Sequence, residues 1–284
     1  MREITLSANA KINLTLDVLA KRTDGYHDVR MILQSIDLCD EVTVAINTGD
    51  WLCVCDDARI PDGEENLAML AARAFLSASG CAPDGVSIRI HKRIPPQAGL
   101  GGGSADAAAV LRALNSLYGE RVSADELMQI GARVGSDVPF CLLGGTALAE
   151  GRGERLTPLP LTPDCAYLLI KPPFSASTPS LYAKIDETTA LEHPDTNGMI
   201  SCLTRADLNG IAGKLCNVFL PVLNAGNPIE PLCKRLLSAG ALGSSLTGTG
   251  SVVFGVFRDL AAAKLASAAF RDEDLRVYLA QNAR

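Results

Sequence analysis

Apolar side chains at every second position predict β-strands in the first third of the chain. Residues 4–8, 12–16, 42–46 and 86–90 carry this alternation. A period of two places successive side chains on opposite faces of a strand, so each segment can bury one face. Residues 22–25, Arg-Thr-Asp-Gly, predict a turn between the early strands.

Helical spacing and capping patterns separate the later strands. Pro61-Asp62-Gly63 predicts a turn, and Asn66 then has the position and side chain of a helix N-cap. Ser123 and Glu126 form a capping-box pattern for a later helix, which Gly135 ends. An alanine-rich helix is expected before it, and the expected apolar face of the first helix consists of Leu67, Leu70, Ala71, Ala74 and Phe75.

The second half of the chain also mixes strands with helices. A proline-rich stretch at 156–164 predicts a boundary between a domain of residues 1–155 and a domain of residues 156–284. Strands and helices interleaved in both halves predict an α+β fold. The expected elements are a strand from Leu142 to Leu148 broken at Gly144-Gly145, a strand at 167–170, a loop at 172–179, a helix-rich section, a buried strand at 252–257 and a final helix at 260–270.

Composition excludes several classes of protein. Hydrophobic residues make up 48% of the 284 residues, charged residues 20% and aromatic residues 5%, with a net charge of −6. This is the profile of an acidic globular protein with a substantial core, and it has no long basic run that would bind nucleic acid. Any phosphate that the protein binds must therefore be held by a local device.

Cysteine and histidine positions argue against a structural metal site. The nine cysteines form no C-x-x-C pair, and the three histidines lie far from them in sequence. Most cysteines lie among apolar residues, as Cys141 does, which favours buried free thiols in a reducing compartment. We find no signal-peptide pattern, and no apolar run reaches the roughly 18 residues of a membrane span. We expect a cytoplasmic protein that binds neither nucleic acid nor membrane.

The strongest local signal is the glycine-rich run from Pro95 to a helix that begins near Ser104. Gly99-Leu-Gly101-Gly102-Gly103 places four glycines in five positions, which lets the backbone approach a ligand and turn its N–H groups inward. A helix start adds unpaired N–H donors and the positive end of the helix dipole. The combination predicts a phosphate site, although glycine clusters also form plain flexible loops.

Two common phosphate motifs do not fit this run. The nucleotide P-loop ends in Gly-Lys-Ser/Thr, and no lysine follows these glycines. The dinucleotide fingerprint G-x-G-x-x-G/A would place Ser104 or Asp106 at its third glycine, and a helix occupies the place of the strand whose end should carry the ribose-binding acid.

Together with two other segments, the loop resembles the GHMP kinase superfamily of galactose, homoserine, mevalonate and phosphomevalonate kinases. Residues 8–14 (ANAKINL) resemble its first motif, Pro95 or Pro96 to Ser104 its second, and residues 246–251 (LTGTGS) its third. Residues 22–27 (RTDGYH), 65–67 (ENL) and 135–140 (GSDVPF) are similar to the branch that phosphorylates a cytidine diphosphate-linked methylerythritol. Ala105 departs from this branch, which often has a second serine there.

The resemblance implies a fold, a co-substrate and a partner class. It implies two domains, the first of the ribosomal-protein-S5 domain 2 type and the second ferredoxin-like, with the active site in the cleft between them. It implies ATP as co-substrate with Mg²⁺, and phosphorylation of the 2-hydroxyl of the methylerythritol in non-mevalonate isoprenoid synthesis. The partner is then a small molecule, and the protein a monomer or a homodimer.

Two residues are the catalytic candidates, each with a plainer alternative. Asp137 precedes Val138-Pro139 and can be a simple helix N-cap, whereas the resemblance implies a general base that takes the substrate hydroxyl proton. Lys11 lies in a strand, where a lone lysine is usually a solvated edge charge. The resemblance implies that Lys11 faces Asp137 and keeps it ionised.

The ATP assignment also follows the resemblance. Asn66 can be only an N-cap, but by resemblance it hydrogen-bonds the adenine side of ATP. Lys92 can close the adenine pocket, although a lysine at a strand end is more often exposed. The residues assigned to ATP are Asn66, Lys92, Pro96, Gly99, Leu100, Gly101, Gly102, Gly103 and Ser104, and Ser104 is also the candidate for a Mg²⁺ contact.

The substrate assignment rests chiefly on the Tyr26-His27 pair. Such a pair in a turn often has no role, but the resemblance implies that Tyr26 stacks on the cytosine and His27 hydrogen-bonds its polar edge. Gly248 and Gly250 either form a tight turn or let the backbone approach the substrate. The residues assigned to the substrate are Asn13, Asp24, Tyr26, His27, Phe174, Thr178, Gly248 and Thr249.

Two other functions remain open on the sequence. A kinase of the same superfamily acting on homoserine or mevalonate would share the glycine motifs but lack the Asp-Gly-Tyr-His turn. A nucleotide-binding module that has lost catalysis would not need both Lys11 and Asp137.

Overall fold

The computed structural model describes residues 2–188, 191–271 and 274–283, and these divide into two compact units. The first unit comprises Met1–Ala10, Cys39–Pro96 and Gly101–Gly144. The second unit comprises Lys11–Leu38, Gln97–Leu100 and Gly145–Arg284. Each unit therefore collects segments that are far apart in the sequence.

This division does not coincide with the expected boundary between residues 155 and 156. Strands β1 (Arg2–Lys21) and β2 (His27–Ile46) are each 20 residues long, and each contributes to both units. The proline-rich stretch contains a regular strand, β6 (Arg155–Leu159), that pairs with β5 (Thr146–Gly151). The assignment of ATP to the first half and substrate to the second remains a prediction.

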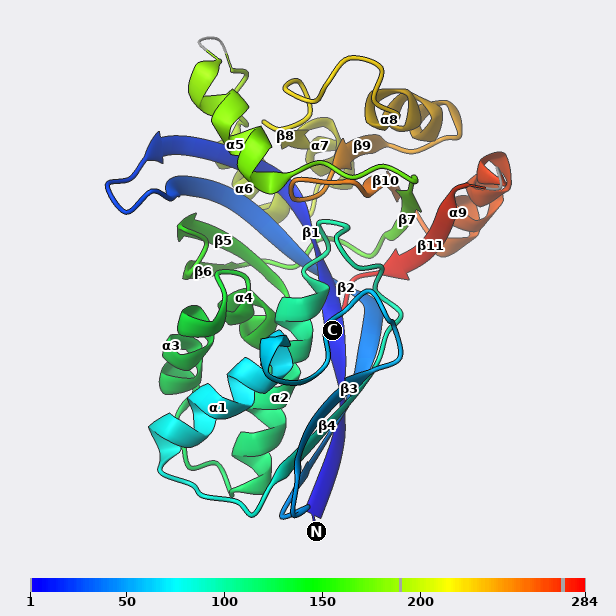
Figure 1. Cartoon of the computed structure of the whole chain (residues 1–284). Coiled ribbons are helices and arrows are strands. Elements are labelled where there is room, and N and C mark those ends of the chain that lie inside the picture. The colour runs from blue at the N-terminus through cyan, green and yellow to red at the C-terminus, as the bar shows by residue number, and fades with distance from the viewer. Residues whose placement is uncertain (1, 189–190, 272–273, 284) are drawn as a thin grey trace. The chain divides into compact units, whose positions relative to one another are not determined.

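The first unit places its helices on one side of its strands (Figure 1). The strand order is β3–β4–β2, with β3 parallel and β2 antiparallel to β4. Helix α2 packs against α1, α3 and α4. The elements introduced here are β3 (Trp51–Cys55), η1 (Gly63–Glu65), α1 (Leu67–Ser79), β4 (Val86–His91), α2 (Gly102–Leu117), α3 (Ala124–Val134) and α4 (Val138–Leu143).

The capping signals predicted for α1 and α3 are confirmed. The side chain of Asn66 accepts a hydrogen bond from the N–H of Ala68 and caps α1. Ser123 and Glu126 form the complete capping box of α3, which ends at Gly135. The expected apolar face of α1 is confirmed in part: Phe75 is fully buried, but Leu70 is 42% exposed.

The second unit contains a four-stranded antiparallel sheet in the order β11–β7–β10–β9. Helix α8 packs against β9 and β10, and α9 packs against β7, β10 and β11. In the same unit β2 pairs with β5, and β1 pairs with β8. The remaining elements are β7 (Ala166–Lys171), α5 (Thr178–Glu187), α6 (Thr196–Thr204), α7 (Leu208–Gly213), β8 (Cys216–Asn217), α8 (Ile229–Ser238), β9 (Gly243–Leu246), β10 (Val253–Phe257), α9 (Leu260–Ser267), η2 (Ala268–Phe270) and β11 (Arg276–Gln281).

Two strands of this sheet form the core of the second unit. All five residues of β10 are buried, as are the first five of β7. Tyr167 and Phe254 meet edge to face with ring centroids 6.3 Å apart. Such continuous apolar runs are readable in sequence as buried strands, and both were predicted.

One predicted strand is wrong in its first half, and five short strands were not foreseen. The segment Leu142–Leu148 is divided between α4 and β5. Proline in the first turn of α4 favours the helix, and Gly144, with a φ of 71°, ends it. Strands β3, β8, β9 and β11 were missed because their apolar patterns are short, and β6 was missed because it lies in the proline-rich stretch.

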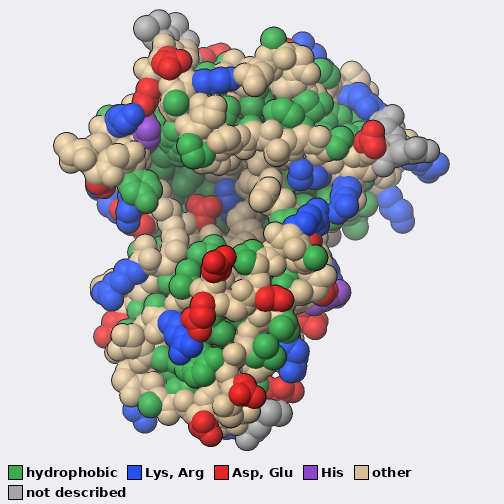
Figure 2. Space-filling model, in the orientation of Figure 1, with side chains coloured by type: hydrophobic (Ala, Val, Ile, Leu, Met, Phe, Trp, Pro, Cys, Tyr) green, Lys and Arg blue, Asp and Glu red, His purple; other side chains and the backbone are tan. Residues whose placement is uncertain are grey.

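The surface shows no concentration of one charge sign on the face in view. Figure 2 shows acidic and basic side chains interspersed with apolar ones. The nine cysteines all lie in the described part of the chain, and none of them forms a disulfide. Burial raises the pKa of Cys53 to about 12 and that of Cys233 to about 11, so these two thiols are unreactive at neutral pH.

Among the helices that the structure describes, none combines the length and apolarity required to cross a bilayer.

Candidate active site

Asn13 lies at the centre of a hydrogen-bonded junction in the second unit. Its Oδ1 accepts hydrogen bonds from Lys11 Nζ at 2.9 Å and from the N–H of Gly248 at 2.8 Å. Thr247 Oγ1 accepts the N–H of Asn13 at 3.2 Å and lies 3.1 Å from the carbonyl oxygen of Gly99. Residues 11–13, 97–100 and 247–248, which belong to three different sequence motifs, are thereby brought together.

Backbone bonds reinforce this junction. The N–H of Lys11 donates to the carbonyl of Leu100 at 3.0 Å, and the N–H of Val252 donates to the carbonyl of Ala98 at 3.2 Å. Asn217 donates two side-chain hydrogen bonds of 2.9 Å to the carbonyls of Leu246 and Gly248. Asn217 was not singled out from the sequence, because an isolated asparagine carries no local signal for such a role.

Gly99 and Gly248 are glycines because two backbones touch here. A Cβ on Gly99 would lie 2.1 Å from the carbonyl oxygen of Thr247, and a Cβ on Gly248 would lie 2.9 Å from the Cα of Gly99. Both residues also have positive φ, 77° and 57°. Gly248 therefore lies in a tight turn that packs against the backbone of Gly99, and its approach to the substrate remains a prediction.

Gly99→Ala should destabilise the protein strongly, because the added methyl group collides with a carbonyl oxygen that cannot rotate away. The cost should exceed by about 1–3 kcal/mol that of a glycine with the same backbone angle in open space. Gly226, with φ 78° and nothing within 4 Å of its Cβ, is the matched control, and Gly226→Ala should cost about 1–2 kcal/mol. Urea unfolding of both variants measures the difference, and equal losses would contradict the close contact.

Lys11 is not the solvated strand lysine that its sequence environment suggests. It is 4% exposed, and its ammonium group donates to Asn13. A buried ammonium requires compensating polar partners, so its position in the strand is maintained against a desolvation cost. Lysine is rarely buried to this extent unless it is paired with polar groups.

In the first unit, helix α2 begins with an open N-terminus. Its N-cap is Gly101, with a φ of 71°, and no side chain caps its first turn. The N–H groups of Gly102, Gly103 and Ser104 therefore have no capping side chain as their acceptor. The helix begins two residues earlier than predicted, so these three residues lie in its first turn and not in a loop. A helix start that no side chain caps, and whose first turn contains glycines, leaves its N–H groups accessible to a phosphate group.

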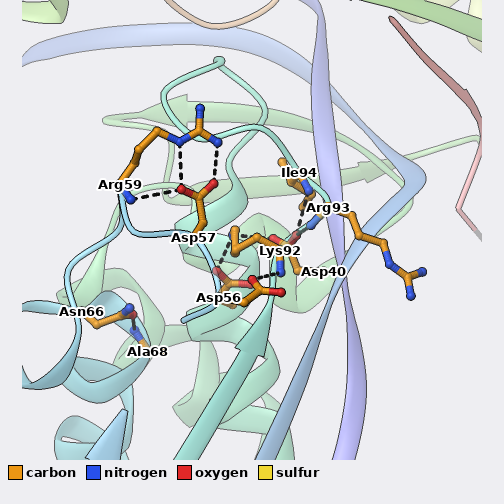
Figure 3. A network of polar contacts seen from close by, with 10 residues as sticks. Asp40, Asp56, Asp57, Arg59, Asn66, Ala68, Lys92, Arg93 and Ile94 are labelled. Carbon is orange, nitrogen blue, oxygen red and sulfur yellow. Dashed lines mark hydrogen bonds and ion pairs between the residues drawn. The ribbon is translucent and has the colours of Figure 1, made fainter. Parts of the chain in front are cut away.

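Lys92 forms a buried ion-pair cluster beneath this helix start (Figure 3). Its Nζ lies 2.5 Å from Asp40 Oδ2 and 2.6 Å from Asp106 Oδ2, and its side chain is 4% exposed. The exposed alternative for Lys92 is thus wrong. A Cβ on Gly102 would lie 3.3 Å from the same Nζ, which places the cluster directly against the glycine run.

Asp40 also holds the chain segment that leads into the loop. Its Oδ1 accepts the N–H groups of Arg93 at 2.6 Å and Ile94 at 2.8 Å (Figure 3). Asp106 reaches the cluster from the second turn of α2. Neither acid was assigned a role from sequence, although a single acid inside the alanine-rich run of α2 was a readable signal.

Burial and charge oppose each other in this cluster. Burial raises the pKa of Asp106 to about 7, although Lys92 favours its ionised form. Burial alone would lower the pKa of Lys92, but the two carboxylates raise it. Within the described residues, Asp106 Oδ1 has no hydrogen-bond partner. The pKa of Lys92 is therefore raised, so Lys92 stays charged, and Asp106 is the acid that burial makes easier to protonate.

The segment around Asn66 is also held by polar contacts. Asn66 Nδ2 donates to the carbonyl of Pro61 at 2.9 Å, and its Oδ1 caps α1 (Figure 3). Asp56 Oδ1 accepts the N–H of Lys92 at 2.8 Å, and its other oxygen pairs with His91. The structural role of Asn66 is thus confirmed, and its contact with ATP remains a prediction.

Asp137 occupies the N-cap position of α4 without capping it. No side-chain hydrogen bond caps this helix, and the φ and ψ of Asp137 are −85° and −12°. Asp195, Asp207 and Asp259 do cap their helices through their carboxylates. The plainer alternative for Asp137 therefore lacks its characteristic contact.

The turn before β2 holds the Tyr26-His27 pair in the second unit. Asp24 accepts the N–H of Tyr26 at 3.1 Å and pairs with Arg22. Tyr26 is 56% exposed, and the guanidinium carbon of Arg152 lies 5.1 Å from its ring centroid. Asp24 thus shapes the turn, while the Tyr26 ring is open to a ligand.

His27 is held on two sides. Its Nε2 lies 2.7 Å from Asp186 Oδ1, and its ring centroid lies 4.8 Å from that of Tyr182. Tyr182 in turn meets Phe219 edge to face at 5.0 Å. Asp186 and Tyr182 come from α5, and Phe219 comes from the segment after β8. No pattern in the sequence predicts these residues near the turn.

The other predicted substrate residues lie near the third motif. Thr178 Oγ1 and Thr249 Oγ1 are 2.9 Å apart. Lys171 Nζ donates to the carbonyl of Phe174 at 3.2 Å and to Ser251 Oγ at 2.8 Å. Residues 174–178 therefore contact the segment that follows Gly248.

Two family models match the chain. One, described as GHMP kinases N terminal domain, covers residues 66–145, and the other, described as GHMP kinases C terminal, covers residues 190–274. A 4-diphosphocytidyl-2-C-methyl-D-erythritol kinase of Lachnoclostridium phytofermentans is 43% identical over 93% of this chain and 91% of that protein. The enzyme of the same name from Acetivibrio thermocellus is 40% identical over 99% of each chain.

Solved structures give the same result. A crystal structure of 4-(cytidine 5'-diphospho)-2C-methyl-D-erythritol kinase has a TM-score of 0.80 and 31% identity, and covers 99% of this chain and 100% of that one. Homoserine kinase from Cytophaga hutchinsonii, at 21% identity, has a TM-score of 0.78 over 100% of this chain and 95% of that one, which demonstrates a shared fold. The predicted α+β, two-domain GHMP fold is confirmed.

Proposed function

This chain belongs to the GHMP kinases, in the branch of the 4-diphosphocytidyl-2-C-methyl-D-erythritol kinases, and we propose that it transfers the γ-phosphoryl group of ATP to the 2-hydroxyl of that substrate. It is a small-molecule kinase of non-mevalonate isoprenoid synthesis. The roles of individual residues set out below are part of the proposal.

The junction around Asn13 is the observation that supports the proposal most directly. Lys11, Gly99 and Gly248 belong to three separate motifs, and hydrogen bonds of 2.8–3.1 Å hold their segments together. Phosphoryl transfer requires little covalent chemistry from the protein and depends on positioning and electrostatics. A rigid junction that contains a buried cation suits that requirement.

The start of α2 is the proposed site of the ATP phosphates. Its first-turn N–H groups have no capping side chain, and the helix dipole favours an anion there. The buried cluster of Lys92, Asp40 and Asp106 lies against this helix start, next to Gly102. We infer that the main role of Lys92 is to connect Asp40, which binds the segment before the loop, to Asp106 of α2. This role is additional to its proposed position beside the adenine.

The donor set of the chain fits a Mg²⁺ ion that arrives with the nucleotide. Among the residues described, no three His, Cys, Asp or Glu side chains form a group that could hold a metal. Mg²⁺ in kinases is commonly bound through substrate phosphates and one or two protein oxygens. Ser104, in the first turn of α2, would offer its hydroxyl. When bound, the ion neutralises charge on the phosphate oxygens.

Asp137 is the proposed general base for the acceptor hydroxyl. The carboxylate of Asp137 stands at the N-cap position of α4, and a carboxylate can accept a proton from a substrate hydroxyl. Lys11, as a buried cation, would favour both the ionised acid and the developing alkoxide.

Tyr26 and His27 are the proposed contacts of the cytosine base. The exposed ring of Tyr26 offers a stacking surface, and His27 offers a polar edge fixed by its neighbours. The aromatic group of His27, Tyr182 and Phe219 supports a planar ligand at this place.

A panel of acceptors tests this function. Purified protein with ATP and Mg²⁺ should release ADP with 4-diphosphocytidyl-2-C-methyl-D-erythritol at a kcat/KM at least about 10³-fold above that with mevalonate or homoserine, because neither offers a base to the Tyr26-His27 pair. A coupled ADP assay measures all three. A preference for mevalonate or homoserine would indicate the second kinase function, and no ADP release with any acceptor would indicate a module without catalysis.

A further inference from the structure

Asp186 of α5 decides which nitrogen of His27 carries the proton. Its Oδ1 lies 2.7 Å from His27 Nε2, and its Oδ2 lies 2.5 Å from Lys21 Nζ. Hydrogen bonds from Lys21 and His27 lower the pKa of Asp186, so the carboxylate is ionised at neutral pH and can only accept hydrogen bonds. His27 Nε2 must then be the donor.

The second ring nitrogen is consequently an acceptor. In a neutral imidazole only one nitrogen bears hydrogen, so a proton on Nε2 leaves a lone pair on Nδ1. Nδ1 has no hydrogen-bond partner within the described residues, and the side chain is 8% exposed. Tyr182 packs against the ring and Phe219 supports Tyr182, so the imidazole cannot turn freely.

We propose that Asp186 is a specificity-determining positioning residue, which presents Nδ1 of His27 to the exocyclic amino group of cytosine and thereby selects cytidine over uridine. This inference rests on the proposed function, because it concerns the base-binding end of the same substrate. Asp186 itself does not contact the base and acts through His27.

The selection follows from the chemistry of the two bases. Cytosine carries an amino donor where uracil carries a carbonyl acceptor. A lone pair on Nδ1 pairs with the donor, whereas it meets the carbonyl oxygen as a second acceptor and leaves both groups unpaired. Sites built around such a hydrogen bond reject the unmatched analogue far more strongly than apolar pockets do.

Asp186→Asn tests the proposal with little change of shape. The amide can donate to Nε2, which permits the tautomer with hydrogen on Nδ1. The ratio of kcat/KM for the cytidine-linked substrate to that for its uridine-linked analogue should fall by about 10-fold or more, the range expected for a hydrogen bond of this type. KM for the cytidine-linked substrate should rise while kcat and the KM for ATP stay within about threefold.

Lys21→Met is the matched control, because it removes the other partner of Asp186 and leaves the bond to His27. Its base preference should stay within about threefold of wild type. ¹⁵N NMR of the His27 ring in the wild-type protein adds a readout that needs neither variant nor substrate: Nε2 should bear hydrogen and Nδ1 should not.

The outcomes separate this inference from the proposed function. Hydrogen on Nδ1 in the wild-type protein, or an unchanged base preference in folded Asp186→Asn, would overturn the role of Asp186 while leaving the kinase function intact. Failure of the wild-type protein to phosphorylate the cytidine-linked acceptor would overturn the proposed function, and the inference with it.

Discussion

Asp137→Ala should lower kcat by about 10²- to 10⁴-fold while the KM for ATP changes little, because a general base contributes to the chemical step and not to nucleotide binding. Asp137 stands at the N-cap position of α4, whereas the ATP phosphates are proposed to bind at the start of α2. Its loss should therefore be visible mainly in turnover. Steady-state kinetics with ATP and the cytidine-linked acceptor measure both constants.

A second aspartate at a helix start provides the control. Asp207 caps α7 by accepting the N–H of Gly210 at 2.9 Å. Asp207→Ala should cost about 1 kcal/mol of stability and leave kcat within about twofold. Near-wild-type kcat in Asp137→Ala would contradict the general-base assignment.

Lys92→Met should lower the free energy of unfolding by about 3–5 kcal/mol, because it leaves Asp40 and Asp106 buried without their shared cation. The methionine keeps most of the lysine stem, so the charge is the main loss. Guanidinium unfolding at fixed pH measures the change. Lys234→Met, which breaks an exposed pair with Glu230 on α8, should cost at most about 1 kcal/mol.

The loss in Lys92→Met should also grow with pH. Burial already raises the pKa of Asp106 to about 7, and removal of the cation raises it further. An acid with a raised pKa binds more protons in the folded than in the unfolded state, so stability falls as pH rises from its unfolded pKa near 4 to its folded pKa. Unfolding at pH 5 and pH 8 should show the larger difference from wild type at pH 8. An equal difference at both values would contradict a buried, proton-linked cluster.

Much of the local structure could be predicted because its signals lie within a few residues. The cap at Asn66 and the capping box of Ser123 and Glu126 need only neighbouring N–H groups. The buried strand at 253–257 is a continuous apolar run, and the long β1 is two alternating segments joined. The strand predicted at Leu142–Leu148 was wrong in its first half because the end of α4 and the start of β5 are both apolar and lie only a few residues apart.

The environment of the candidate site residues could not be predicted in the same way. Lys92 reads as an exposed lysine at a strand end, but Asp40 and Asp106, distant in sequence, bury and neutralise it. In the sequence, His27 looks like an exposed turn residue without a role. In the structure, Asp186 and Tyr182 of α5 contact its ring. A pairing between distant residues leaves no periodicity in the sequence, because each partner is an ordinary residue in its own segment.

The sequence by itself predicted a phosphate site at the glycine run, and it determined several strands and helix ends and the family to which the chain belongs. Only the tertiary structure decided that Gly99 meets Thr247 and Gly248, that Lys92 is buried between two acids, and that Asp186 holds His27. The physical reason is the distance along the chain over which each kind of interaction acts. Backbone propensity, capping and alternation act over a few residues, whereas desolvation, ion pairing and backbone contact depend on which distant segments the fold brings within a few ångströms.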